Sequence, residues 1–169
     1  MELWDNANLI KALKENKVVV MPTDALYGIV GRAQDVEVVQ KIYNLRKRSP
    51  DKPCIILIGD IGELKRFSVS LTAKQQAALK DYWSFNMNET GKGPVSIIFE
   101  CLDESFIEVG PLIAPSANIE GMPPSQNIME AKKYFGDLVD LYIDAGVTTG
   151  KASKIIQLNA DGSSLVVRE

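Results

Sequence analysis

The sequence contains no histidine, and its two cysteines, Cys54 and Cys101, lie far apart. Histidine is the commonest general base and the commonest transition-metal ligand, so its absence excludes a Ser-His-Asp triad and argues strongly against a zinc site. Each cysteine lies within or beside an apolar run, so we expect reduced thiols rather than a disulfide or a nucleophile. Any catalysis must therefore depend on Lys, Arg, Asp, Ser and backbone N–H groups, or on a bound Mg²⁺. Phosphoryl and nucleotidyl transfer can proceed with such groups.

Long apolar runs are also missing. No run approaches the roughly 20 residues of a membrane span, and the first 16 residues lack the basic and apolar regions of a signal peptide. We therefore expect a cytoplasmic protein without a membrane partner. A net charge of −3 argues against binding nucleic acid through total charge, although a local basic patch would still allow it. The length of 169 residues and an apolar content of 46% predict one domain over residues 1–169 with a substantial core.

Short apolar runs alternate with segments of helical periodicity along the chain. The predicted helices cover residues 5–16, 35–45, 61–67, 71–82 and 127–135, with N-caps at Asp35, Thr72 and Asn127. The predicted strands cover residues 18–21, 29–31, 53–58, 94–101, 110–116, 138–143, 153–158 and 165–167. Residues 83–93 are predicted to form a loop, and residues 159–162 a hairpin turn. This order predicts an α/β fold with a mixed sheet and flanking helices.

A dense group of cations follows the second predicted helix. The group consists of Lys41, Arg46, Lys47, Arg48 and Lys52, and Asp51 is the single acid nearby. Such a local positive field favours an anionic ligand. The same pattern also fits a solvated loop at a helix C-terminus, where cations complement the helix dipole. The pattern alone does not separate these readings.

Two further polar groups follow predicted strands. Pro115-Ser116-Ala117-Asn118 places a hydroxyl and an amide two residues apart, where both could face one ligand. Taken alone, this pattern favours a turn in which these side chains bond their own backbone. Thr23-Asp24 could likewise hold a polar ligand or cap the following turn. A P-loop over residues 145–152 is rejected, because Ala145 and Ala152 replace the required glycine and hydroxyl residue.

Taken in order, these motifs resemble the Sua5/YciO/YrdC family, the threonylcarbamoyl-AMP synthases. The motifs are PTDALYG, RKRSPDKP, GPVS, APSAN, GKASKII and a late Arg168, and the resemblance runs from about residue 11 to 168. It implies a twisted α/β fold around a large central cavity. It also implies that L-threonine, bicarbonate and ATP react to form threonylcarbamoyl-AMP and pyrophosphate. That product serves the N6-threonylcarbamoyladenosine modification of tRNA, so tRNA and the other modification proteins are implied partners.

The resemblance also implies roles for individual residues. The family's Lys-x-Arg and Ser-x-Asn signatures fall on four residues, which we expect to be catalytic: Arg46, Arg48, Ser116 and Asn118. Arg46 stands where the family has lysine. On the ATP side we expect Lys47, Lys52, Pro115 and Arg168, and on the threonine side Thr23, Tyr27 and Ser153. Mg²⁺ is expected to accompany ATP, and no residue is assigned as a metal ligand.

The sequence departs from the family pattern between Trp83 and Ser116. Only about twenty residues separate Ser96 from Ser116, so one strand and one helix are missing or shortened. A family arginine expected in this stretch to help hold substrate is also absent. An alternative function is therefore a protein of the same fold that binds double-stranded RNA or tRNA without full synthase activity.

Overall fold

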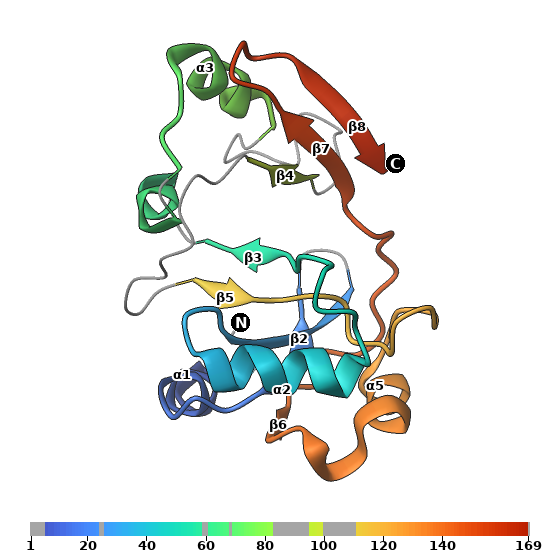
Figure 1. Cartoon of the computed structure of the whole chain (residues 1–169). Helices are drawn as coiled ribbons and strands as arrows, with labels where there is room; N and C mark the ends of the chain where they lie inside the picture. Colours follow the sequence, from blue (N-terminus) through green and yellow to red (C-terminus); the bar gives the residue numbers. More distant parts are fainter. Residues whose placement is uncertain are drawn as a thin grey trace. The chain divides into compact units, whose positions relative to one another are not determined.

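The computed structural model describes residues 6–23, 26–58, 61–67, 69–82, 95–99 and 111–168. The chain divides into two compact units (Figure 1). Unit 1 consists of Met1–Gly59 and Glu108–Lys151, and unit 2 of Asp60–Ile107 and Ala152–Glu169. The prediction of a single domain over residues 1–169 stays a prediction.

Unit 1 contains a five-stranded sheet in the order β3-β5-β2-β1-β6. Its strands are β1 (Val19–Pro22), β2 (Tyr27–Arg32), β3 (Ile56–Leu57), β5 (Leu112–Ile113) and β6 (Leu141–Tyr142). Its helices are α1 (Asn6–Lys14), α2 (Val36–Arg46), α5 (Ile128–Phe135) and the 3₁₀ turn η2 (Gly136–Leu138). Only the β1–β6 pair is parallel, so the sheet is mixed, as the sequence predicted.

Several predicted strands are shorter than their apolar runs. The run 53–58 was predicted as a buried strand, but only Ile56–Leu57 pairs, and Leu57 is exposed. This prediction was wrong because β3 lies at the sheet edge and pairs with β5 alone. The strand predicted over residues 18–21 is one residue longer at its end, because Pro22 pairs with Tyr27 as the last residue of β1.

Helix α2 lies along β2 because one glycine lets it approach closely. A Cβ atom on Gly31 would lie 2.3 Å from Val38 Cγ1. The helix begins as predicted, since Asp35 accepts a hydrogen bond from the Val38 N–H at 3.0 Å. Ile42, on the same face, is fully buried in the core of unit 1. The helix ends at Arg46, and residues 47–53, which we call the basic loop, begin at that point.

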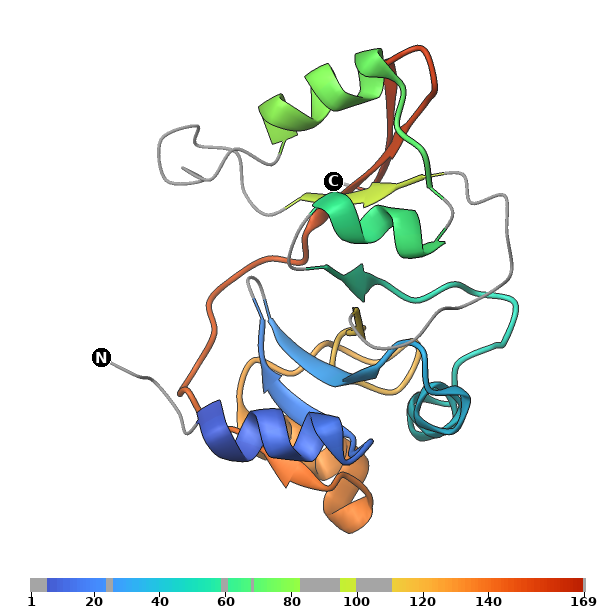
Figure 2. The same ribbon diagram turned by 90° about the vertical axis from the view of Figure 1, so that its left-hand side faces the viewer.

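Unit 2 contains a three-stranded mixed sheet in the order β4-β7-β8. Its elements are η1 (Ile61–Phe67), α3 (Ala73–Tyr82), β4 (Val95–Ile98), β7 (Lys154–Leu158) and β8 (Ser164–Arg168). Strand β4 pairs parallel with β7, whereas β8 pairs antiparallel. Both views place α3 beside the β7–β8 hairpin (Figures 1 and 2).

Two contacts explain why α3 packs on the hairpin. Thr72 accepts the Gln75 N–H at 3.1 Å, which confirms the predicted N-cap, and donates its hydroxyl hydrogen to the Ala160 carbonyl at 2.8 Å. The predicted hairpin turn is also present, since the Gly162 N–H bonds to the Asn159 carbonyl at 3.0 Å. The loop predicted at residues 83–93 lies outside the described residues. Within the described part of the chain, none of the helices has the length and apolar character needed to cross a membrane.

Candidate functional site

The loop that carries the Ser-x-Asn pair is held against the start of β2. The Ile29 N–H donates to the Pro115 carbonyl at 2.9 Å, and the Ala117 N–H donates to the Tyr27 carbonyl at 2.8 Å. Between them, Ser116 forms an isolated β-bridge with strand β2. The loop is therefore an extension of the sheet, and its position is determined by main-chain hydrogen bonds.

The structure brings three of the four predicted catalytic residues together. Arg46 donates from Nε to the Asn118 carbonyl at 3.1 Å, and from Nη2 to Asn118 Oδ1 at 3.3 Å and Ser116 Oγ at 3.4 Å. Ser116 donates in turn to Asn118 Oδ1 at 2.7 Å. The Asn118 amide is oriented by its own donation to the Met122 carbonyl at 2.6 Å. We call Arg46, Ser116 and Asn118 the Arg46 cluster.

Arg46 carries a buried charge, and Glu120 attracts this charge without forming a salt bridge with it. Its side chain is only 4% exposed, and its Nη1 is buried without a hydrogen-bond partner. Among the residues that the structure describes, no carboxylate forms an ion pair with it. Burial lowers the pKa of Arg46, yet a guanidinium remains charged at neutral pH. A buried cation of this kind is costly unless it is paired, so the cluster favours an anion.

The fourth predicted catalytic residue, Arg48, lies on the basic loop outside the cluster. It donates from Nε to the Lys52 carbonyl at 3.2 Å and from Nη2 to the Pro53 carbonyl at 2.7 Å. Tyr43 donates to the same Lys52 carbonyl at 2.8 Å. Burial raises the pKa of Tyr43 to about 12, and a hydrogen bond to Cys54 adds to this. Sequence reasoning missed Tyr43 as a support of the basic loop.

Glu120 joins the basic loop to the Ser-x-Asn loop. It forms a salt bridge with Lys52 (Nζ to Oε1, 2.5 Å) and accepts the Ser49 N–H on Oε2 at 3.1 Å. Its own N–H donates to the Arg46 carbonyl at 2.8 Å. The hydrogen bond from Lys52 lowers the pKa of Glu120. The sequence analysis did not identify Glu120 as a link between the two loops. The signal that could have indicated it is an acidic residue two positions after Asn118, in a chain that also has a basic loop.

Two other cations of the predicted patch have different surroundings. Lys41 forms a salt bridge at 2.7 Å with Asp140, the residue directly before β6. Lys47 is exposed and ends α2 in the left-handed conformation, with φ 50° and ψ 39°, and its N–H donates to the Asn44 carbonyl. The positive patch of the sequence is thus divided, and Lys41 contributes to structure instead.

The hydroxyl groups predicted for the threonine side already have partners in unit 1. Thr23 donates from Oγ1 to the Leu26 carbonyl at 2.7 Å, as in the turn-capping alternative. Tyr27 is fully buried, and its hydroxyl donates to the Gly146 carbonyl at 2.9 Å and accepts the Ala145 N–H at 2.9 Å. Burial raises the pKa of Tyr27. Asp24, predicted beside Thr23, lies outside the described residues.

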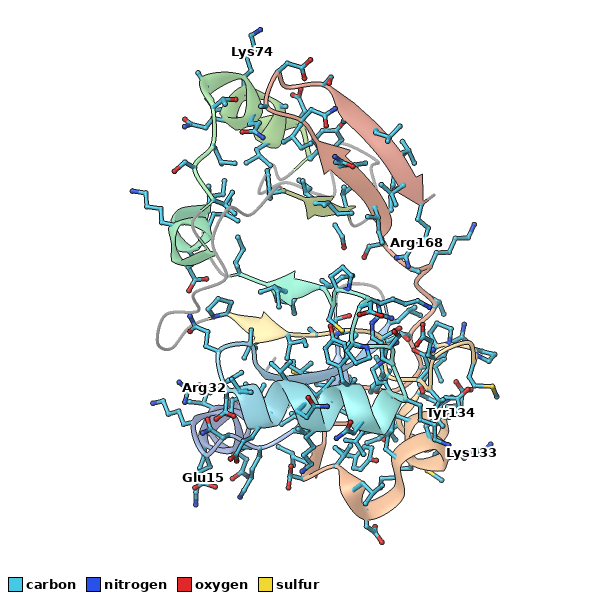
Figure 3. All side chains as sticks on the ribbon, viewed as in Figure 1. Glu15, Arg32, Lys74, Lys133, Tyr134 and Arg168 are labelled. Atoms are coloured by element: carbon cyan, nitrogen blue, oxygen red, sulfur yellow. The ribbon has the colours of Figure 1, made fainter. Side chains whose placement is uncertain are left out.

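The two remaining predicted residues, Ser153 and Arg168, lie in unit 2. Arg168, at the end of β8, donates from Nη2 to the Ser153 carbonyl at 2.6 Å (Figure 3). The fold of this unit therefore brings these two residues together, although 15 positions separate them. Within the described ranges, no group of three acidic, cysteine or histidine residues could hold a metal ion.

A family comparison covers nearly the whole chain. The Sua5/YciO/YrdC family model, described as "Telomere recombination", matches residues 11–108 and 99–169. The two matched segments overlap within the stretch that the sequence identified as shortened.

Named relatives point to the same family. A threonylcarbamoyl-AMP synthase from Chromohalobacter salexigens is 25% identical over 80% of this chain and 82% of its own length. A Mycobacterium leprae protein with the same name, given provisionally, is 26% identical over 89% of this chain and 76% of its own.

Solved structures share the fold. Sua5 from P. abyssi, complexed with L-threonine, superposes with a TM-score of 0.81 at 22% identity over 99% of this chain. This chain spans only 54% of that Sua5 chain. YciO from E. coli superposes with a TM-score of 0.75 at 18% identity, over 96% of this chain and 87% of its own. These likenesses confirm the predicted mixed α/β fold.

Proposed function

Because this chain belongs to the Sua5/YciO/YrdC family, we propose that it is an L-threonylcarbamoyl-AMP synthase. The substrates would be L-threonine, bicarbonate and ATP, and the products threonylcarbamoyl-AMP and pyrophosphate. The names of its relatives support a transferase of this kind. The L-threonine bound to P. abyssi Sua5 supports threonine as the amino acid. The product would serve the N6-threonylcarbamoyladenosine modification of tRNA.

The observation that carries this proposal is the buried charge of Arg46, which forms no salt bridge with the carboxylates that the structure describes. An enzyme that transfers a nucleotidyl group must neutralise phosphate charge in a site that excludes water. The Arg46 cluster offers a guanidinium oriented by Ser116 and Asn118, with Nη1 still free to donate. Without an anion this arrangement is unfavourable, and a phosphate group would supply its missing partner.

The chemistry requires two bond-forming steps. The amine of threonine attacks the carbon of bicarbonate, and loss of water leaves a carbamate. A carbamate oxygen then attacks the α-phosphorus of ATP, and pyrophosphate leaves with the electrons of the broken P–O bond. Arg46 would stabilise charge on the phosphates, and Arg48, Lys47 and Lys52 of the exposed loop would attract the polyphosphate. Ser116 and Asn118 would orient Arg46.

Mg²⁺ would enter bound to the phosphates of ATP. Mg²⁺ commonly binds through substrate phosphates with few protein ligands. When bound, it would add positive charge to the phosphates.

Pyrophosphate release tests the proposal directly. The assay contains ATP and magnesium, with threonine and bicarbonate each present or omitted. We expect release that requires both co-substrates, and a carbamoylated adenylate detectable by mass spectrometry. Release that does not depend on threonine, or no release at all, would contradict the proposal.

A second candidate function is binding of double-stranded RNA or tRNA. The observation that favours it is the presence of Arg46 where the family has lysine. The planar guanidinium of Arg46, held by three hydrogen bonds, contacts phosphate differently from the compact ammonium of a lysine. Filter binding of duplex RNA at two salt concentrations tests it. Salt-sensitive RNA binding without threonine-dependent ATP turnover would favour this function over the synthase.

A further inference from the structure

We propose that Glu120 is a built-in competitor for an anion subsite on the basic loop. Its carboxylate accepts the Ser49 N–H at 3.1 Å and contacts the Lys52 ammonium at 2.5 Å. A main-chain N–H and an ammonium are the donors that a phosphate oxygen would use. In this structure, therefore, a carboxylate of the protein occupies the place of a ligand anion.

The subsite is open to an incoming anion. The Lys52 side chain is 60% exposed and that of Glu120 is 26% exposed, so solvent reaches their contact. An exposed ion pair of this kind is weak and exchangeable. A pyrophosphate carries more charge than a carboxylate and has more acceptor oxygens, so it can displace Glu120 from both donors.

The basic loop does not depend on the Glu120 carboxylate for its shape. Arg48 bonds the carbonyls of Lys52 and Pro53, and Tyr43 also bonds the Lys52 carbonyl. The main chain of Glu120 is held separately, because its N–H donates to the Arg46 carbonyl. Its side chain can therefore leave the subsite while both loops stay in place. This is why we infer competition rather than a structural brace.

The inference rests on the proposed function only for the identity of the ligand, the pyrophosphate part of ATP. Competition makes a definite prediction about affinity, because removing the competitor must strengthen anion binding. A brace makes the opposite prediction, since removing it would disorder the loop and weaken binding. The sign of the change therefore separates the two roles.

The experiment is calorimetric titration of the full chain with pyrophosphate, without threonine or bicarbonate. Glu120→Gln keeps the side-chain size and removes the charge. We expect it to bind pyrophosphate about two- to fivefold more tightly than the wild type, as loss of one exposed ion pair implies. The control is Glu37→Gln, which makes the same change in net charge at an exposed position of α2 and should leave the affinity for pyrophosphate unchanged.

A double substitution shows whether the effect passes through Lys52. In a Lys52→Ala background, Glu120→Gln should give a clearly smaller gain, because the main competed donor is gone. Weaker or unchanged pyrophosphate binding in Glu120→Gln, an equal gain in Glu37→Gln, or an undiminished gain without Lys52 would each overturn the inference. The titration measures binding and not turnover. Its outcomes therefore test the role of Glu120 even if the synthase assay gives no activity.

Discussion

The buried charge of Arg46 allows a prediction that separates the effect of charge from that of side-chain geometry. Arg46→Met keeps an unbranched side chain of similar length and removes the cation. Arg46→Lys restores the lysine of the family pattern and keeps the charge without the planar fork. Arg32→Met is the matched control, since Arg32 lies at the end of β2 in the same unit and donates to Asn16 (Figure 3).

The expected effect on stability is small for a buried arginine. The bond from Nε to the Asn118 carbonyl, at 3.1 Å, is the best of three, and its loss costs about 1–2 kcal/mol. The two bonds from Nη2, at 3.3 and 3.4 Å, are long and contribute less. Removing a buried charge without an ion-pair partner offsets part of this cost. The free energy of unfolding of Arg46→Met should therefore fall by no more than about 2 kcal/mol, or roughly 4–8 °C in Tm.

The expected effect on turnover is much larger. If Arg46 faces the phosphates, loss of its charge should cost about 3–4 kcal/mol of transition-state stabilisation, a fall of about 10²–10³-fold in pyrophosphate release. Arg46→Lys should lose much less, because an ammonium retains the charge. Arg46→Met with turnover within threefold of the wild type, in a protein that melts normally, would refute this reasoning. Equal losses in both variants would show that the fork, not the charge, is needed.

Three further predictions concern unit 1. Gly31→Ala should lower the free energy of unfolding by about 1–3 kcal/mol in urea melts, because its Cβ would meet Val38 at 2.3 Å; an unchanged midpoint would contradict this packing. Tyr27→Phe should cost about 1–2 kcal/mol, because it removes the hydrogen bonds of the hydroxyl with Gly146 and Ala145 and a longer one, at 3.4 Å, with Asp144. Its KM for threonine should stay unchanged, and a raised KM would place the hydroxyl at the substrate. Burial raises the pKa of Asp140, but hydrogen bonds, chiefly from Lys41, lower it by more than burial raises it. The pKa of Asp140 therefore lies below its ordinary value. Its contribution to stability is therefore complete at neutral pH and lost as pH falls below about 4. Asp140→Asn should be less stable than wild type at pH 7, with the difference shrinking at pH 3 in urea melts.

Local signals in the sequence were sufficient for most helices and turns. Asp35 and Asn127 cap α2 and α5 as predicted, because a capping side chain and the N–H groups it accepts lie within three residues. Strand lengths were predicted less well. The run at residues 53–58 is apolar enough for a buried strand, yet only Ile56–Leu57 pairs, because strand length depends on a partner remote in sequence.

The sequence by itself determined the family, the mixed α/β class and the choice of Arg46, Ser116 and Asn118, since short motifs and residue types carry that information. Only the tertiary structure decided what those residues do to one another. Arg46 is 70 positions from Ser116 and 72 from Asn118 in the sequence. The pairing of β2 with β5 brings these distant segments together. That pairing buries the guanidinium without a salt bridge to any carboxylate in the described part of the chain. It also sets Glu120 against the basic loop, and no local pattern of charges specifies either outcome.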